Sequence, residues 1–359
     1  MVCDIRQYCS VIWDGRCLKG ENMNIQTRLN DNKRRDLAKS LPLKQPFVLL
    51  IDPSSLCNLR CTWCPSGYDS LMSEYGRKNG VMSYELFEKI VSDSSEFGGK
   101  INVLRMYKEG EPLVNPRFAD MVALAKKSGV FNKIETTTNG VLLGKETNRK
   151  LIDAGIDQIN ISVNGVSDEQ IFKHTGRHID FKTYCENIID LCKISKDCVI
   201  YVKSIKDVLS DEEQQRFMDI FGEWADRIFL ERLSPAWPDF DICQSGYIFE
   251  KIGNYGQPAE DRIACPYIFY VMVVNSDGTC DTCVGDWKHH QLTGDVKTES
   301  LKNIWLGDAL KKIQLAHLEN KRELYEMCKV CEVIRYGCYD NLDNGRKVIA
   351  ERINKGQYN

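Results

Sequence analysis

Between residues 46 and 232, short runs of β-forming residues alternate with longer helical segments, and this alternation constrains the fold more than any other feature. The predicted strands are Phe47–Asp52, Ile101–Tyr107, Lys133–Thr138, Gln158–Val163, Cys198–Lys203 and Arg227–Glu231. The predicted helices between them are Tyr84–Ser92, Arg117–Ser128, Lys145–Ala154, Phe181–Ile194 and Asp211–Trp224. Repeated βα units predict an α/β fold with a parallel sheet, and six strands favour an open, partial (β/α)6 TIM-like barrel. Candidate site residues should follow these strands, because ligands bind at the C-terminal strand ends of such sheets.

The other segments suggest smaller units around this barrel. We assign residues 1–45 to an N-terminal arm, 46–232 to the barrel, and 233–264 to a linker or lid rich in proline and glycine. We assign residues 265–340 to a small auxiliary domain and 341–359 to a C-terminal tail. Within the auxiliary domain we expect a hairpin, Tyr267–Asn275 with the return strand Thr279–Cys283, and one helix, Leu301–Leu318. In the linker, Trp237 and Phe240 either line a substrate cleft or pack the lid.

The unusual part of the composition is its 16 cysteines. A chain with 43% hydrophobic residues can build a core without disulfides, and the N-terminus lacks the apolar segment of a signal peptide. We therefore expect a cytoplasmic protein whose clustered cysteines bind metal. The net charge of −3 gives no electrostatic basis for nucleic-acid binding, and no run approaches the roughly 18 apolar residues of a membrane helix.

The first cysteine cluster is a C-x3-C-x2-C triplet, Cys57, Cys61 and Cys64, directly after the first predicted strand. Three thiolates on one loop can ligate three irons of a [4Fe–4S] cube, whose full ligation takes four cysteines. The fourth iron is then open to a small chelating molecule. Zinc is the alternative metal, although zinc sites usually combine paired C-x2-C motifs.

With Trp63 before its last cysteine, this triplet resembles the signature of the radical S-adenosylmethionine (SAM) superfamily. The resemblance implies that the open iron binds the amino and carboxylate groups of SAM. It also implies reductive cleavage of SAM to a 5′-deoxyadenosyl radical, with a flavodoxin- or ferredoxin-type protein as electron donor.

Residues after the second predicted strand resemble the family's GGEP motif. Gly110, Glu111 and Pro112 match it, whereas Glu109 replaces its first glycine. In the family this turn and its carboxylate meet the cationic amino group of SAM, and a carboxylate suits a positive charge. The resemblance therefore makes Gly110, Glu111 and Pro112 candidate SAM-binding residues.

Three further candidates for SAM binding follow later strands. Asn139 lies in a Thr-Asn-Gly sequence and Ser162 in a sequence similar to the family's S-I-D-G, in which Asn164 replaces the usual aspartate. Asn-Gly by itself is also an ordinary turn signal. Arg177 matches an arginine that grips the SAM carboxylate in the family, although a plain surface arginine is the alternative.

A second cysteine cluster comprises Cys265, Cys283, Cys328 and Cys331. Four thiolates from two converging segments make a closed site. The ligand spacing resembles the auxiliary-cluster domain of the SPASM/twitch group, in its single-cluster form of 2-deoxy-scyllo-inosamine dehydrogenase-type enzymes. The resemblance implies one auxiliary [4Fe–4S] cluster, with zinc as the alternative.

Two nearby cysteines have less certain roles. Cys280 is a rival to Cys283 as the ligand, and Cys280 and Cys338 are candidate free thiols that would donate a hydrogen atom to a substrate radical. The neighbouring His289-His290 pair suggests no role, and the sequence does not identify a catalytic base.

The resemblance implies a radical SAM oxidoreductase that acts on a small polar or peptide substrate. We expect oxidation of a secondary alcohol of a sugar or aminocyclitol, with the auxiliary cluster accepting the surplus electron. Radical modification of a ribosomal peptide, by thioether formation, epimerisation or oxidation, is the alternative. Only 56 residues precede Cys57 and they show no leader-binding domain pattern, which favours the small substrate. A non-catalytic zinc scaffold and an activase for glycyl-radical enzymes are further alternatives.

Overall fold

The structure is a computed structural model that describes residues 23–28, 36–77, 79–242, 247 and 249–359. Its centre is a nine-stranded sheet with the order β6-β5-β4-β3-β2-β1-β7-β8-β9. The strands are β1 (Val48–Ile51), β2 (Val103–Met106), β3 (Ile134–Thr138), β4 (Gln158–Ser162), β5 (Val199–Ile205), β6 (Arg227–Glu231), β7 (Val271–Val274), β8 (Thr279–Asp281) and β9 (Leu292–Asp295). Strands β1 to β7 pair in parallel, and β8 and β9 extend the sheet in antiparallel fashion. The α/β fold and the six-stranded open barrel are thereby confirmed.

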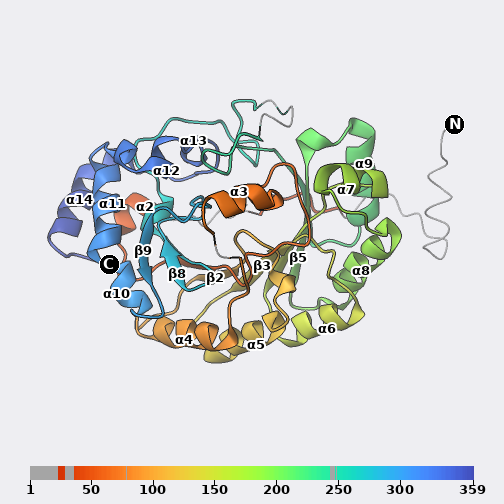
Figure 1. Cartoon of the computed structure of the whole chain (residues 1–359), viewed down its shortest axis with the longest axis horizontal. Helices are drawn as coiled ribbons and strands as arrows, with labels where there is room; N and C mark the ends of the chain where they lie inside the picture. The colour runs from red at the N-terminus through yellow and green to blue at the C-terminus, as the bar shows by residue number, and fades with distance from the viewer. Residues whose placement is uncertain (1–22, 29–35, 78, 243–246, 248) are drawn as a thin grey trace.

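Helices cover the outside of this curved sheet. The longer ones are α4 (Tyr84–Ser95), α5 (Phe118–Ser128), α6 (Lys145–Asp153), α7 (Asp168–Thr175), α8 (Phe181–Ile194), α9 (Asp211–Phe221), α11 (Asp308–Leu318) and α14 (Arg346–Asn354). The shorter ones are α2 (Leu37–Ser40), α3 (Asp69–Glu74), α10 (Leu301–Trp305), α12 (Glu326–Lys329) and α13 (Val333–Tyr336). Helices α4, α5, α6 and α8 follow one rim, and α10, α11 and α14 gather at the end opposite α9 (Figure 1).

Local sequence explains where the barrel helices begin. The N-cap side chains Ser83, Ser167, Asp180 and Ser210 each accept a hydrogen bond from a backbone N–H in the first turn of α4, α7, α8 and α9 respectively. Such caps satisfy amides that have no partner within the helix. At the other end, α5 and α7 stop at Gly129 and Gly176, which adopt the left-handed conformation that favours glycine.

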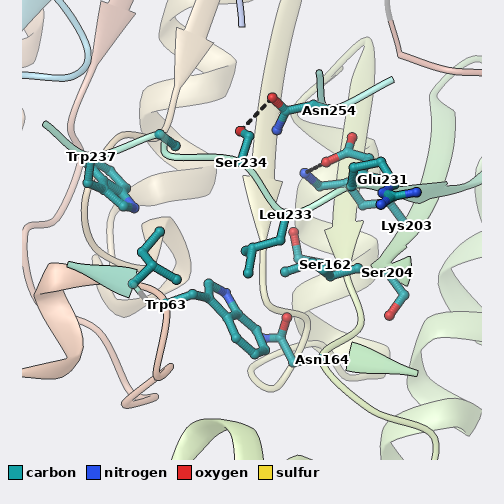
Figure 2. Close-up of a pocket in the computed structure, with 14 residues that line it drawn as sticks. Trp63, Ser162, Asn164, Lys203, Ser204, Glu231, Leu233, Ser234, Trp237 and Asn254 are labelled. Carbon is teal, nitrogen blue, oxygen red and sulfur yellow. Dashed lines mark hydrogen bonds and ion pairs between the residues drawn. The ribbon is translucent and has the colours of Figure 1, made fainter. Parts of the chain in front are cut away.

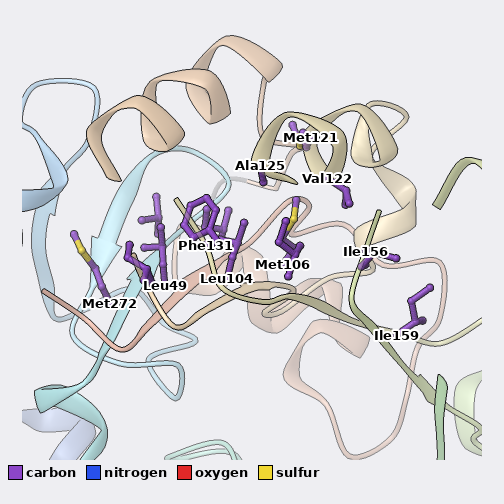
Figure 3. Close-up of a cluster of buried hydrophobic side chains, with 14 of the residues drawn as sticks. Leu49, Leu104, Met106, Met121, Val122, Ala125, Phe131, Ile156, Ile159 and Met272 are labelled. Atoms are coloured by element: carbon purple, nitrogen blue, oxygen red, sulfur yellow. The ribbon is translucent and has the colours of Figure 1, made fainter. Parts of the chain in front are cut away.

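Alternation along the strands divides the sheet into two faces. On the outer face, Leu49, Leu104 and Met106 pack with Met121 and Val122 of α5 in the main hydrophobic core (Figure 3). The inner face is apolar where β1 and β7 meet, with a cluster of Val48, Leu50, Val271 and Val273. Further along, the inner face also carries charged side chains, among them Arg105 of β2, Glu135 of β3 and Lys203 of β5. The barrel interior is therefore suited to polar ligands on that side.

The described part of the N-terminal arm is tied to the barrel. Ile25 forms a parallel bridge with Ile228 of β6. Arg28 then reaches the inner face, where it pairs with Glu135 of β3 and lies with its guanidinium 5.3 Å from the ring centroid of Tyr107. The arm's other residues, 1–22 and 29–35, lie outside the described residues.

Three local predictions need correction. Strand β7 is not only part of a hairpin, because it pairs in parallel with β1 and so joins the auxiliary segment to the barrel sheet. The single helix expected at Leu301–Leu318 is two helices, α10 and α11, with Gly307 between them. The segment assigned as a C-terminal tail contains helix α14, whose Ile349 and Ile353 are fully buried. None of the helices in the described segments has the length and apolar character needed to span a membrane.

Candidate functional site

The loop that carries Cys57, Cys61 and Cys64 follows β1 and is held by backbone hydrogen bonds. Arg60 N–H donates to the Thr175 carbonyl at 2.8 Å, and Thr62 N–H donates to the His174 carbonyl at 3.0 Å, so the loop is attached to the end of α7. The Arg60 guanidinium in turn donates to the Cys57 carbonyl at 2.9 Å. These contacts hold the three cysteines on one compact turn.

The three thiols are close enough to influence one another. Burial is the first cause that raises the pKa of Cys61, and the charges of Cys64 and Cys57 raise it further. Burial likewise raises the pKa of Cys64 to about 11. Thiols of this kind stay protonated until a metal displaces the proton, so metal binding would release protons here.

Amide side chains lie against two of these sulfurs. The Asn164 Nδ2 atom lies 3.5 Å from the Cys61 Sγ and donates to it. Asn139 donates through its Nδ2 to the Asn58 side chain at 2.7 Å and lies 3.9 Å from the Cys57 Sγ. The exchange of the usual aspartate for Asn164 thus removes a charge but supplies a hydrogen-bond donor to the Cys61 sulfur.

The turn of Gly110, Glu111 and Pro112 lies directly beside the cysteine loop. Glu111 N–H donates to the Leu56 carbonyl at 2.9 Å. A Cβ atom on Gly110 would lie 2.1 Å from the Ser54 carbonyl oxygen and 2.5 Å from that of Leu56, so only glycine allows this approach. Pro112 is buried at the start of a short 3-10 turn.

The Glu111 carboxylate faces the end of β3. It accepts hydrogen bonds from Thr138 Oγ1 at 2.7 Å, Asn139 N–H at 2.8 Å and Leu113 N–H at 3.1 Å. Burial raises its pKa, although these hydrogen bonds lower it. Within the described residues, Glu111 therefore orients the turn that carries Asn139.

A cavity of about 190 Å³ opens at the C-terminal ends of β4, β5 and β6. Ser162, Asn164 and Trp63 line it together with Lys203, Glu231 and Asn254 (Figure 2). The Lys203 Nζ and Glu231 Oε2 atoms lie 2.6 Å apart, and Ser234 Oγ donates to Asn254 Oδ1 at 2.7 Å. The cavity is thus rich in groups that bind hydroxyls. Trp237 also lines it, whereas Phe240 packs 6.2 Å from the Trp287 ring.

Arg177 is less clearly part of this site. It follows the last turn of α7 and is exposed. Its side chain makes no ion pair or hydrogen bond with the described residues, so its assignment to the SAM carboxylate stays a prediction.

The second set of cysteines also converges. The pKa of Cys283 is raised by burial first and then by the charges of Cys328, Cys331 and Cys265, which places all four thiols near one another. Burial raises the pKa of Cys328 to about 11 and that of Cys331 to about 12. The Arg322 guanidinium donates to the Cys328 and Cys331 carbonyls, the latter at 3.4 Å, and holds the C-x2-C turn.

The two uncertain cysteines occupy different places. Cys280 is fully buried in the main hydrophobic core, with acidic side chains and no other cysteine among its electrostatic neighbours. This position disfavours Cys280 as a ligand rival or hydrogen donor, and both assignments stay predictions. Cys338 is buried within hydrogen-bonding reach of Cys265, at the auxiliary site.

The spacing of the thiols bears on the choice between zinc and iron–sulfur clusters. Around a tetrahedral zinc ion with Zn–S bonds of about 2.3 Å, sulfurs lie about 3.8 Å apart. Among the described residues, only Glu109, Asp281 and His289 bring three candidate ligand atoms within 4.8 Å of one another. Within the described residues, no three cysteine sulfurs of either site therefore lie within 4.8 Å of one another.

Those three residues belong to a group of buried charges that the sequence analysis missed. We call this group the charged seam: Arg77, Lys108, Glu109, Asp281 and His289. The Lys108 Nζ lies 2.7 Å from Glu109 Oε1, 2.8 Å from Asn275 Oδ1 and in contact with Asp281 Oδ2. Glu109 also pairs with Arg77, and its Oε1 and Oε2 lie 3.1 and 3.2 Å from His289 Nε2. The seam already holds an ammonium at its centre, so it is not a vacant cation site.

The charged seam lies between the two cysteine sites. Glu109 is an electrostatic neighbour of Cys64, and the Lys108 Nζ lies 3.5 Å from the carbonyl oxygen of Asp286, an electrostatic neighbour of Cys283. The one signal in the sequence was Glu109 itself, an acidic residue in a position where the family motif has glycine.

Comparison of the sequence with known protein families identifies two domains in the chain. Residues 51–218 match the model of the radical SAM superfamily, and residues 265–332 match SPASM, an iron-sulfur cluster-binding domain. A curated relative is the tungsten-containing aldehyde ferredoxin oxidoreductase cofactor-modifying protein of Pyrococcus furiosus, which is 32% identical over 208 residues. That match covers 56% of each of the two chains, and matches to GTP 3′,8-cyclases, such as that of Chlorobaculum tepidum, cover 42% of the relative or less.

Solved structures share the fold at low identity. BtrN in complex with AdoMet and 2-DOIA superposes with a TM-score of 0.53 at 16% identity, over 84% of this chain and 98% of BtrN. SuiB of Streptococcus suis bound to precursor peptide SuiA gives a TM-score of 0.56 at 16% identity, over 76% of this chain and 67% of SuiB. These likenesses concern the fold, and the molecules bound in the two structures differ. The chain thus contains a radical SAM domain followed by a SPASM domain, an iron-sulfur cluster-binding domain.

Proposed function

We propose that this radical SAM enzyme oxidises a secondary alcohol of a small polar molecule, such as a sugar or aminocyclitol, to a ketone. In this proposal Cys57, Cys61 and Cys64 hold the SAM-binding [4Fe–4S] cluster. Cys265, Cys283, Cys328 and Cys331 hold the auxiliary [4Fe–4S] cluster. Gly110, Glu111, Pro112, Asn139, Ser162 and Arg177 form the SAM-binding set. A flavodoxin- or ferredoxin-type protein supplies the electron.

The overall reaction separates a hydrogen atom, a proton and an electron. When bound, the SAM site supplies the 5′-deoxyadenosyl radical that removes the carbinol hydrogen atom, and the auxiliary cluster takes the surplus electron. The hydroxyl proton needs an acceptor on the protein. The observation that carries the proposal is a histidine–carboxylate pair, His289 and Glu109, which lies between the two cysteine sites.

The hydrogen bonds around His289 define which of its nitrogens accepts a proton. The Lys108 ammonium has three hydrogens, and its three nearest oxygens are Glu109 Oε1, Asn275 Oδ1 and Asp281 Oδ2, with the Asp286 carbonyl oxygen further away at 3.5 Å. It therefore has no hydrogen left for His289 Nε2, 3.4 Å away. Nε2 must then carry the proton that is donated to Glu109, which leaves Nδ1 unprotonated in the neutral ring.

This Nδ1 atom is suited to act as a base. No hydrogen bond joins it to the described residues, and the His289 side chain is 16% exposed. Burial lowers the pKa of His289, but the hydrogen bond and the charge of Glu109 raise it above its ordinary value. A carboxylate that orients an imidazole and stabilises its protonated form is the arrangement of known proton-accepting histidines. His289 also has a φ of 55°, a strained backbone angle for a residue other than glycine.

The polar cavity at β4 to β6 supports a hydroxyl-rich ligand. Lys203, Glu231 and Asn254 offer donors and acceptors within one cavity. An alcohol or ribose hydroxyl can exchange hydrogen bonds with such groups.

The test is anaerobic turnover of the reconstituted enzyme with panels of sugars, aminocyclitols and peptides. Mass spectrometry would follow 5′-deoxyadenosine together with a loss of two daltons from the substrate. His289→Ala should retain SAM cleavage but lose at least about 100-fold in ketone formation, since a general base contributes roughly 10²–10⁴-fold. The matched control is His290→Ala, because this neighbouring ring lies outside the charged seam and 3.7 Å from Glu326.

Two results would contradict the proposal. Turnover of peptides and of no polyol would assign the enzyme to peptide modification. Equal ketone formation by the His289→Ala variant and the wild type would remove His289 as the proton acceptor.

A further inference from the structure

Gln291 is a buried residue whose side chain bridges two parts of the auxiliary site. Its Nε2 atom lies 3.5 Å from the Cys328 Sγ, and its Oε1 accepts a hydrogen bond from the Met327 N–H at 3.1 Å. The Met327 N–H is a donor, so it fixes the oxygen end of the amide and turns the NH2 end towards the sulfur. The side chain is 9% exposed, which keeps water from replacing either contact.

The backbone of Gln291 is also fully engaged. Its N–H donates to Asp286 Oδ2 at 2.7 Å, and its carbonyl accepts from Thr282 N–H at 3.0 Å and from Thr282 Oγ1 at 2.7 Å. Asp286 has no exposed surface, and its carbonyl oxygen lies 3.5 Å from the Lys108 Nζ of the charged seam. These hydrogen bonds hold Gln291 in place. Through Asp286 they also connect it to Lys108, which precedes the turn of Gly110, Glu111 and Pro112.

We propose that Gln291 is a positioning residue that sets the reduction potential of the auxiliary cluster through its N–H···S hydrogen bond to Cys328. The inference rests on the proposed ligation of that cluster by Cys328. A hydrogen bond to a ligand sulfur stabilises the reduced, more negative form of a cluster, and therefore raises its potential. In an oxidation that leaves a surplus electron, a higher potential makes the auxiliary cluster a better acceptor.

The molecule provides its own comparison. Asn164 donates to Cys61 through the same kind of contact, also at 3.5 Å, but at the SAM-binding site. If amide donors tune both clusters, each substitution should change the potential of its own cluster and leave the other unchanged. A purely structural role of Gln291 predicts no change in either potential.

The experiment uses anaerobically reconstituted full-length protein without SAM or substrate, and electron paramagnetic resonance to follow redox titrations. Each cluster is measured alone, the auxiliary one in a background with Cys57, Cys61 and Cys64 changed to Ala. Gln291→Met removes the donor at similar volume, and Gln291→Glu removes it while keeping an acceptor for Met327 N–H. Asn164→Leu is the reciprocal variant. A second background has the auxiliary cysteines changed to Ala and keeps the SAM-binding cluster. Every variant is made in both backgrounds, so that the potential of each cluster is measured for each substitution.

Both Gln291 variants should lower the potential of the auxiliary cluster, and Gln291→Glu by more because it adds negative charge. The expected fall in the ratio of reduced to oxidised cluster is about three- to tenfold, or about 30 to 60 mV for one electron. Asn164→Leu should lower only the potential of the SAM-binding cluster. If Gln291→Met fails to hold the cluster, Gln291→Leu, which also removes the donor and adds no charge, decides. An unchanged auxiliary potential in these uncharged variants would overturn the inference, whereas a background protein that binds no cluster would overturn the ligand assignment instead.

Discussion

Removal of the central cation of the charged seam should destabilise the whole protein. Lys108 has a fully buried side chain, and its ammonium compensates two carboxylates, Glu109 and Asp281, that are equally buried. Glu109 would keep Arg77 and His289 as partners in Lys108→Met. Asp281 would keep only His289, whose Nε2 lies 3.8 Å away. The variant therefore leaves a buried carboxylate almost uncompensated.

The magnitude follows from this loss. Breaking a buried ion pair by removing one partner costs about 3 to 5 kcal/mol. With an unfolding entropy of about 2.1 cal/mol/K per residue, a chain of 359 residues loses about 1.3 °C of melting temperature per kcal/mol. We expect Lys108→Met to melt about 4 to 7 °C below the wild type.

The assay is thermal unfolding of reconstituted protein followed by circular dichroism at one scan rate. Lys126→Met is the matched control, because the side chains of its pair with Asp157 are 48% and 28% exposed. Such a surface pair contributes about 0 to 1 kcal/mol. The reasoning would be refuted if Lys108→Met melted within about 1 °C of this control.

Three further predictions concern the two cysteine sites and the charged seam. Cys283→Ala should lose about four irons per chain, because it removes a proposed cluster ligand, whereas Cys280→Ala should lose none. Equal iron loss in the two variants, measured by iron analysis, would contradict the assignment. Gly110→Ala should lower SAM cleavage about 100-fold, because the added Cβ lies 2.1 Å from a backbone oxygen and displaces the turn. SAM cleavage is measured as 5′-deoxyadenosine formed with a chemical reductant. Gly80→Ala, with no atom within 4 Å of the added Cβ, should retain activity, and equal losses would argue against the packing explanation. Burial would raise the pKa of Glu109, but Lys108 and the His289 hydrogen bond lower it to about 2. The ion pairs of Glu109 therefore stabilise the protein fully at a pH above the unfolded pKa, which is near 4.5. That stability is lost as the pH falls towards 2. Between pH 5 and 3 the melting temperature of the wild type should therefore fall more steeply than that of Glu109→Gln. Parallel slopes of the two proteins would contradict this prediction.

The barrel strands were predictable because their signal is local. Runs such as Val199–Ile205 and Gln158–Ser162 combine β-branched residues with flanking turn signals, and serine caps such as Ser83 and Ser210 mark the helices between them. Each of these features depends on residues a few positions apart. The cysteine triplet was visible for the same reason, since all its members lie on one loop.

The charged seam was not predictable, because its members are distant in the sequence. Lys108 meets Asp281 across 173 positions, and Glu109 meets His289 across 180. Nothing in either local sequence indicates its partner. The parallel pairing of β7 with β1 brings the two segments together, and the predicted local hairpin did not include that pairing.

By itself the sequence determined the βα order, the two cysteine sets and the turn after β2, because periodicity and short-range spacing encode them. Tertiary structure alone decided that Cys283 joins the other auxiliary cysteines while Cys280 enters the core. It also decided that His289 receives a carboxylate partner and that Gln291 reaches the Cys328 sulfur. Each of these outcomes depends on which face of a strand or loop meets a distant neighbour, and packing of the whole chain sets that choice.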